Sequence, residues 1–162
     1  MRAWVFGDSV DTDVITPGRY MKLPVEEIAQ HCLEPVSPGF ATRVKRGDFV
    51  VAGRNFGCGS SREQAPAALK ELGVAALIAE SFAGIFFRNS LNLGLPALVC
   101  KEAKSIRDGD RLEVDFQNSI IRNSDNGKTF AFEPIPPHLM QMVRDGGLLP
   151  HLEKRLKCRT TS

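Results

Sequence analysis

Continuous apolar runs alternate with helical patterns through the middle of the chain. Three such runs predict buried strands, at residues 49–53, 74–79 and 95–100. Apolar residues at helical spacing predict intervening helices over 61–72 and 82–93, which Gly73 and Gly94 close. This β-α-β-α-β order favours a parallel sheet with right-handed crossovers.

The segments on either side predict smaller elements. A short strand is expected at 3–6, followed by a polar turn at 7–13, and apolar residues at helical spacing predict a short helix over 25–33. Three short strands, with a hairpin signal at Asn126-Gly127, predict a small antiparallel meander over 110–116, 119–123 and 128–132. Two helices are expected from Pro137 to about Leu156, with a break at Gly146-Gly147 and a frayed tail over about 157–162.

Length and composition narrow the class of protein. The 162 residues, 43% of them hydrophobic, match one domain over 1–162 with its own core. The formal charge of +2 comes from dispersed basic residues, so a nucleic-acid partner is not expected. No apolar run approaches 18 residues, which predicts a cytoplasmic protein with no membrane partner.

The four cysteines give no metal signature. They are widely separated and form no Cys-x-x-Cys pair, at Cys32, Cys58, Cys100 and Cys158. This spacing argues against a zinc site or an iron-sulfur cluster held by this chain, and we expect reduced thiols. The three histidines also lack spacing that suggests a metal site.

The segment NFGCGSSRE at 55–63 carries the strongest chemical signal, because it follows a predicted strand and opens a predicted helix. Gly57 and Gly59 allow a sharp turn and close approach to a ligand, and helix-terminal N–H groups favour an anion. Arg62 adds a planar fork that suits a carboxylate. An anion site is one interpretation of this turn.

The alternative interpretation is a capping box, in which Ser60 and Glu63 satisfy the helix N-terminus and do no chemistry. Local pattern alone favours it. However, a cap does not require two glycines, and Arg62 in a first helical turn opposes the helix dipole. Pro66 also conflicts with a cap at Ser60, unless the regular helix begins later than residue 61.

The run FGCGSSREQAP at 56–66 closely resembles the signature of the swivelling domain of the aconitase superfamily, in its stand-alone small-subunit form. Three further stretches match the family in order: 7–20, 45–53 and 79–96. The resemblance extends from Phe6 to the segment at 146–152. It implies an α/β fold of the swivelling β/β/α type, with a mostly parallel central sheet, flanking helices and a small antiparallel meander.

The resemblance also implies a reaction and a partner. The family moves a hydroxyl between adjacent carbons of a carboxylic acid by dehydration and rehydration. A large subunit, in a heterodimer or heterotetramer, holds a four-iron four-sulfur cluster that acts as the Lewis acid. This chain then binds no cofactor and is an inactive half of a hydro-lyase by itself.

Residue roles follow from the matched motifs. By similarity, Ser60 is the general base and Arg62 binds a substrate carboxylate, with Gly59 and Ser61 beside them. The matched Asp-Thr-Asp favours Asp13 as a catalytic partner that orients an imidazole or an arginine across the subunit interface, although turn formation is the more common role of aspartates in such a segment.

The family's specificity loop corresponds to Tyr20, Met21, Lys22 and Leu23, a sequence that matches neither the usual isopropylmalate nor the usual homoaconitate version. Apolar Met21 and Leu23 favour isopropylmalate, and hence leucine biosynthesis, whereas Lys22 favours a substrate with an extra carboxylate, unless it is simply solvated. Gly84 replaces an arginine that is usual in the family. The alternative from a different class of function is a non-catalytic module that would use the same anion-binding turn to sense a carboxylate metabolite or to regulate a partner.

Overall fold

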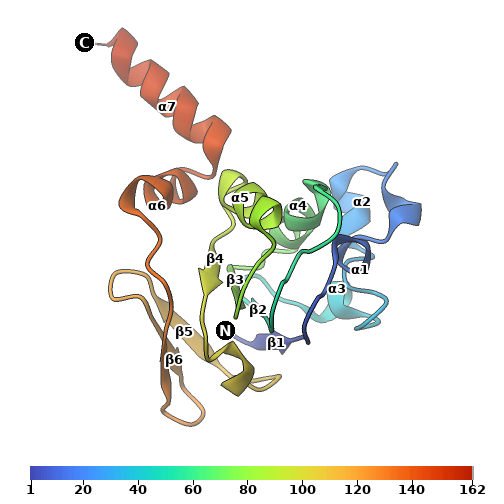
Figure 1. The fold of residues 1–162 in the computed structure, drawn as a ribbon. Helices are drawn as coiled ribbons and strands as arrows, with labels where there is room; N and C mark the ends of the chain where they lie inside the picture. Colours follow the sequence, from blue (N-terminus) through green and yellow to red (C-terminus); the bar gives the residue numbers. More distant parts are fainter. Residues whose placement is uncertain (162) are drawn as a thin grey trace.

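Four parallel strands form the central sheet of the computed structural model, which describes residues 1–161 (Figure 1). The strands are β1 (Ala3–Val5), β2 (Phe49–Ala52), β3 (Ala76–Ala79) and β4 (Ala97–Val99), in that spatial order. All three pairings are parallel; Val50, for example, lies opposite Trp4 on one side and Leu77 on the other. The parallel sheet predicted from the apolar runs is confirmed.

One face of this sheet packs against helices. Helix α4 (Gln64–Glu71) connects β2 to β3, and α5 (Gly84–Asn92) connects β3 to β4. Each strand pairs with the next in sequence, so right-handed crossovers place both helices on the same face. The core cluster on this face joins alternate strand residues to helix residues: Trp4, Val50, Ala52, Leu77 and Ala79 with Ala65, Ala68, Leu69 and Phe86.

The opposite face packs against a second, antiparallel sheet. Strands β5 (Leu112–Asp115), β6 (Ile120–Asn123) and β7 (Thr129–Ala131) form the predicted meander in the order β5-β6-β7. A second core cluster lies between the sheets and combines Ala3, Phe49, Val51, Ala76, Ile78 and Leu98 with Leu112, Ile121, Phe130 and Phe132. The expected β/β/α layering is confirmed, because alternate residues of each central strand face different layers.

The long crossover from β1 to β2 carries three short helices, α1 (Thr12–Ile15), α2 (Val25–Ala29) and α3 (Phe40–Arg43), and a 3-10 turn at Gly18–Tyr20. The polar turn predicted over 7–13 is wrong at its last two residues, which begin α1 after Asp11 caps this helix by accepting the Val14 N–H at 2.8 Å. Helix α2 ends at Ala29, before the predicted residue 33.

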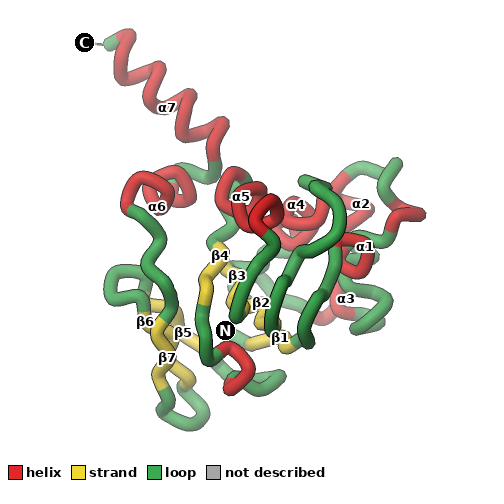
Figure 2. The backbone as a smooth tube through the Cα atoms, viewed as in Figure 1, coloured by secondary structure: helices red, strands yellow, loops and turns green. Residues whose placement is uncertain are grey.

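The C-terminal segment leaves the compact body of the molecule. After the 3-10 helix Ala103–Ser105 and the meander, α6 (Pro137–Arg144) returns to pack against α5, and α7 (Leu148–Thr160) projects outward (Figures 1 and 2). The predicted break at Gly146-Gly147 is confirmed, and α7 extends past Leu156 to Thr160. None of the helices in residues 1–161 combines the length and apolarity needed to span a membrane.

Candidate functional site

The turn after β2 is hydrogen-bonded directly to the N-terminal crossover. Gly57 donates its N–H to the Val10 carbonyl at 2.8 Å, and Thr12 donates its N–H to the Cys58 carbonyl at 2.8 Å. These two bonds align residues 10–12 with 57–58 like a short extension of the parallel sheet. The two segments that carry the candidate chemistry therefore lie side by side.

The two glycines of this turn allow that approach. Gly57 has a φ of +82°, and a Cβ at this position would overlap the ring of Phe86. Gly59 has a φ of +101°, and its Cβ would lie 3.2 Å from Thr12 Oγ1. Both positions need a left-handed backbone conformation that disfavours side chains, so glycine is required by geometry.

Ser60 is exposed, but its side chain is oriented by a buried neighbour. Thr12 is 1% exposed, and its Oγ1 lies 3.0 Å from Ser60 Oγ. The same Thr12 oxygen accepts the Ser60 backbone N–H at 3.1 Å. Thr12 therefore retains a hydroxyl proton that it can donate to Ser60 Oγ.

Thr12 was missed by the sequence reasoning, which considered only the aspartates on either side of it. The available signal was its position inside the matched Asp-Thr-Asp. The contact itself joins residues 48 positions apart, and no local pattern predicts it.

The capping-box interpretation is wrong. Helix α4 begins at Gln64, and Glu63 occupies the cap position without a side-chain cap hydrogen bond. Arg62 consequently precedes the helix and does not lie in its first turn, contrary to our expectation. Pro66 occupies the first turn, where a missing N–H leaves no helical bond unmade.

Arg62 is paired with Asp13 across the two segments. Its Nη1 donates to Asp13 Oδ1 and also reaches the Thr16 carbonyl at 3.4 Å. The Arg62 side chain is 27% exposed and that of Asp13 is 67% exposed, so the pair sits at the molecular surface with the guanidinium on its inner side. The ion pair holds a cation next to the serine turn.

A cavity of about 530 Å³ opens beside this turn, a volume in the usual range for small-molecule sites. It is lined by Val25, Ser60, Ser61, Arg62, Glu63, Gln64, Ala67 and Leu93. Asn89 Nδ2 donates to the Ser61 carbonyl at 3.3 Å, which fixes the rim of the cavity to α5. Three predicted site residues, Ser60, Ser61 and Arg62, thus share one cavity.

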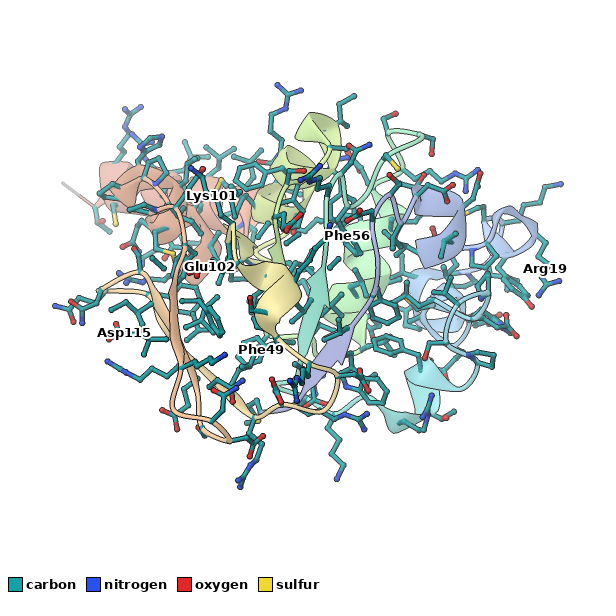
Figure 3. The ribbon with its side chains drawn as sticks, turned by 60° about the horizontal axis from the view of Figure 1, so that its bottom comes forward. Arg19, Phe49, Phe56, Lys101, Glu102 and Asp115 are labelled. Carbon is teal, nitrogen blue, oxygen red and sulfur yellow. The ribbon has the colours of Figure 1, made fainter. Side chains whose placement is uncertain are left out.

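The predicted specificity loop lies outside this cavity. Tyr20 stacks on His31 with ring centroids 3.6 Å apart and donates its hydroxyl to Glu34 at 3.3 Å. Arg19, at the outer edge of the molecule in Figure 3, lies over the same Tyr20 ring. Met21 is half-buried, and Lys22 and Leu23 are exposed. The described loop therefore presents Lys22 and Leu23 to solvent at the surface.

The cysteines and Gly84 are the other positions that the sequence brought to attention. Cys32 and Cys100 are buried, and this burial raises the pKa of both thiols, which stay protonated and unreactive. Cys58 is half-buried beside the turn. Across residues 1–161, no three His, Cys, Asp or Glu side chains are placed to hold a metal ion. Gly84 begins α5 with open space where a Cβ would lie.

Comparison with known proteins gives a consistent result. The model of the aconitase C-terminal domain matches residues 26–103. The chain is 53% identical over 149 residues to 3-isopropylmalate dehydratase small subunit 1 of Archaeoglobus fulgidus, covering 91% of this chain and 92% of that protein. It is 49% identical over 156 residues to the methanogen homoaconitase small subunit of Methanothermobacter thermautotrophicus, covering 96% of this chain and 93% of that protein.

The fold also matches the solved structure of a protein with a similar name. A crystal structure of 3-isopropylmalate dehydratase from Methanocaldococcus jannaschii superimposes with a TM-score of 0.94 at 42% identity, over 99% of this chain and 96% of that one. The high identity over nearly full length confirms the family resemblance inferred from the four motifs. The chain therefore belongs to the family of aconitase-type small subunits that includes those of the 3-isopropylmalate dehydratases and homoaconitases.

Proposed function

We propose that this chain is the small subunit of a hydro-lyase that isomerises a hydroxy di- or tricarboxylic acid by dehydration and rehydration. The observation that carries the proposal is the cavity in which Ser60 and Arg62 lie together. A base and a carboxylate-binding cation are the two groups needed to remove a proton from the carbon next to a carboxylate.

Ser60 is the proposed base. A free serine hydroxyl is a weak base, so its alkoxide must be stabilised by fixed donors and positive charge. Thr12 supplies a donor at 3.0 Å, and Thr12 is itself held because its oxygen accepts the Ser60 N–H. Arg62 adds a positive charge in the same cavity.

Arg62 is proposed to bind the substrate carboxylate through its planar fork. Asp13 orients this guanidinium from the solvent side, a role supported by their ion pair within this chain and not by the expected partner across the subunit interface. Gly59 and Ser61 flank the base and present backbone groups to the substrate. In this assignment Asp13 acts through Arg62.

The other half of the site belongs to the large subunit. When bound in that subunit, a four-iron four-sulfur cluster supplies a Lewis acid for the departing hydroxyl. The described residues of this chain offer no ligand set for a cluster. Their part is to hold the substrate carboxylate and to take and return the proton at Ser60 Oγ.

We propose 3-isopropylmalate and 2-isopropylmalate as the first substrate pair, in leucine biosynthesis. The apolar side chains of Met21 and Leu23 support this choice, as do relatives named 3-isopropylmalate dehydratase from several organisms. Homocitrate or homoaconitate is the alternative, supported by Lys22 and by the homoaconitase relative. Exposure of Lys22 and Leu23 leaves both side chains accessible to a substrate held against the large subunit.

The test is turnover by the chain mixed anaerobically with cluster-bearing large subunits, followed by the ultraviolet absorbance of the unsaturated intermediate. Isopropylmalate and homoaconitate are offered separately. Activity only in the mixture supports the half-site. If no mixture is active and calorimetry shows that the isolated chain binds a carboxylic acid tightly, the sensor function replaces this proposal.

A further inference from the structure

Helix α7 presents an apolar stripe that its own chain leaves uncovered. Within α7, which the structure describes in full, no residue is buried. Leu149, Leu152 and Leu156 are 72%, 43% and 63% exposed. Their spacing of three and four residues places them on one face of the helix.

The base of α7 is fixed, so the direction of this stripe is defined. His151 Nδ1 lies 2.7 Å from Asp145 Oδ2, and Lys154 Nζ donates to Asp145 Oδ1 at 2.9 Å. Gly147, which precedes the helix, is packed so closely against the Asn92 carbonyl that a Cβ would overlap it. A helix of 13 residues is only marginally stable alone, and its stability normally comes from packing of an apolar face.

The stripe begins next to the proposed active site. A second cavity, of about 260 Å³, lies at the base of α7, and Leu148, Leu149 and Pro150 form one side of it. Glu63 and Leu93 line both this cavity and the Ser60 cavity. A protein that covers the Ser60 cavity therefore meets the leucines of α7 on the same side of the molecule.

The charge of α7 indicates which kind of partner fits. From residue 153 to 159, Lys154, Arg155, Lys157 and Arg159 outnumber the single acid Glu153. A second copy of this helix would bring like charges together where the two C-terminal halves meet, whereas a partner with acidic residues around an apolar groove would complement both features.

We propose that the leucine stripe of α7, formed by Leu149, Leu152 and Leu156, is a docking surface for the large subunit, which receives it in an acid-rimmed apolar groove. This inference rests on the proposed function, since that function requires a large subunit over the Ser60 cavity. The stripe contributes affinity and has no part in the chemistry.

The test compares Leu156→Glu with Val36→Glu, which places the same charge on an exposed apolar position away from α7. Sedimentation measures binding to the large subunit without substrate, and turnover is titrated separately with increasing small subunit. For Leu156→Glu we expect the dissociation constant and the half-saturating concentration to rise by about 10-fold or more, with the same plateau rate. Val36→Glu should match the wild type in both measurements.

Equal binding by Leu156→Glu and wild type would overturn the docking proposal while leaving turnover intact. Self-association of the isolated chain that Leu156→Glu abolishes, without weaker binding to the large subunit, would assign the stripe to a second copy and also overturn it. Binding of the wild type without turnover of any acid would instead count against the proposed function. Circular dichroism of each variant checks that the fold is retained.

Discussion

The hydroxyl of buried Thr12 lies 3.0 Å from the hydroxyl of exposed Ser60, and the same Thr12 oxygen accepts the Ser60 N–H at 3.1 Å. Because Thr12 Oγ1 accepts the Ser60 N–H, its own hydroxyl proton can point to Ser60 Oγ, and an alkoxide at Ser60 would accept that proton as a hydrogen bond. The arrangement would stabilise negative charge on Ser60 as it forms.

Thr12→Val tests this relationship, since valine keeps the shape and removes the hydroxyl. We expect kcat of the assembled enzyme to fall about 10²-fold and the pH–rate profile to move to higher pH, because the proposed Ser60 alkoxide loses a donor. Thr12→Ser should restore both. A Thr12→Val profile that overlays the wild type would show that Thr12 has only a packing role.

Arg62→Lys keeps the charge but loses the fork that suits a carboxylate. We expect kcat/KM to fall by roughly 10- to 100-fold, mostly through KM, because one charge-assisted hydrogen bond contributes about 1.5–3 kcal/mol. The matched control is Arg122→Lys, in an ion pair with Asp115 on the meander. Equal kinetics for the two variants would remove Arg62 from substrate binding.

Gly57→Ala and Gly84→Ala form a matched pair for the geometry of the serine turn. Gly57 has a φ of +82° and no room for a Cβ beside Phe86, whereas the space around Gly84 is open. Chemical unfolding should show that Gly57→Ala lowers the free energy of unfolding by more than about 1 kcal/mol. For Gly84→Ala the free energy of unfolding should change by less than about 1 kcal/mol. Similar stabilities for both variants would contradict the packing of the turn against α5.

Asp145 gives a prediction about pH. Hydrogen bonds from His151 and Lys154 lower the pKa of its carboxyl from 3.8 to about 2. Because the folded-state pKa is the lower one, the stabilisation is present above about pH 4 and is lost as pH falls towards 2. The difference in unfolding free energy between wild type and Asp145→Asn should therefore shrink over this range. A titration of Asp145 by NMR that gives an ordinary pKa would contradict the pairing at the base of α7.

The layers of the fold were predictable because burial on both faces leaves a direct mark on sequence. Residues 49–53, 74–79 and 95–100 are continuous apolar runs, and alternate residues of each face different core clusters. The meander followed from Asn126-Gly127 and short alternating strands. Helix α1 was not predictable, since the side chain of Asp11 signals a turn and a helix cap equally well.

The candidate site was predictable only in part, because local sequence patterns do not record contacts between distant segments. The motifs predicted Ser60 and Arg62 as site residues, and the two line one cavity. The local Ser60-Glu63 spacing suggested a cap that does not form, because hydrogen bonds to residues 10–12 hold the turn against α1. The stacking of Tyr20 on His31 and the exposure of the α7 leucines likewise depend on where whole segments lie, which composition does not record.

The most direct test of the central claim is turnover of isopropylmalate by the assembled complex containing Ser60→Ala. The control is Ser105→Ala, which changes another exposed serine outside the candidate site. We expect Ser60→Ala to lower kcat by about 10²- to 10⁴-fold while folding and binding to the large subunit are unchanged, and Ser105→Ala to behave as wild type. Near-normal turnover by a folded, assembled Ser60→Ala complex would contradict the assignment of Ser60 as the base.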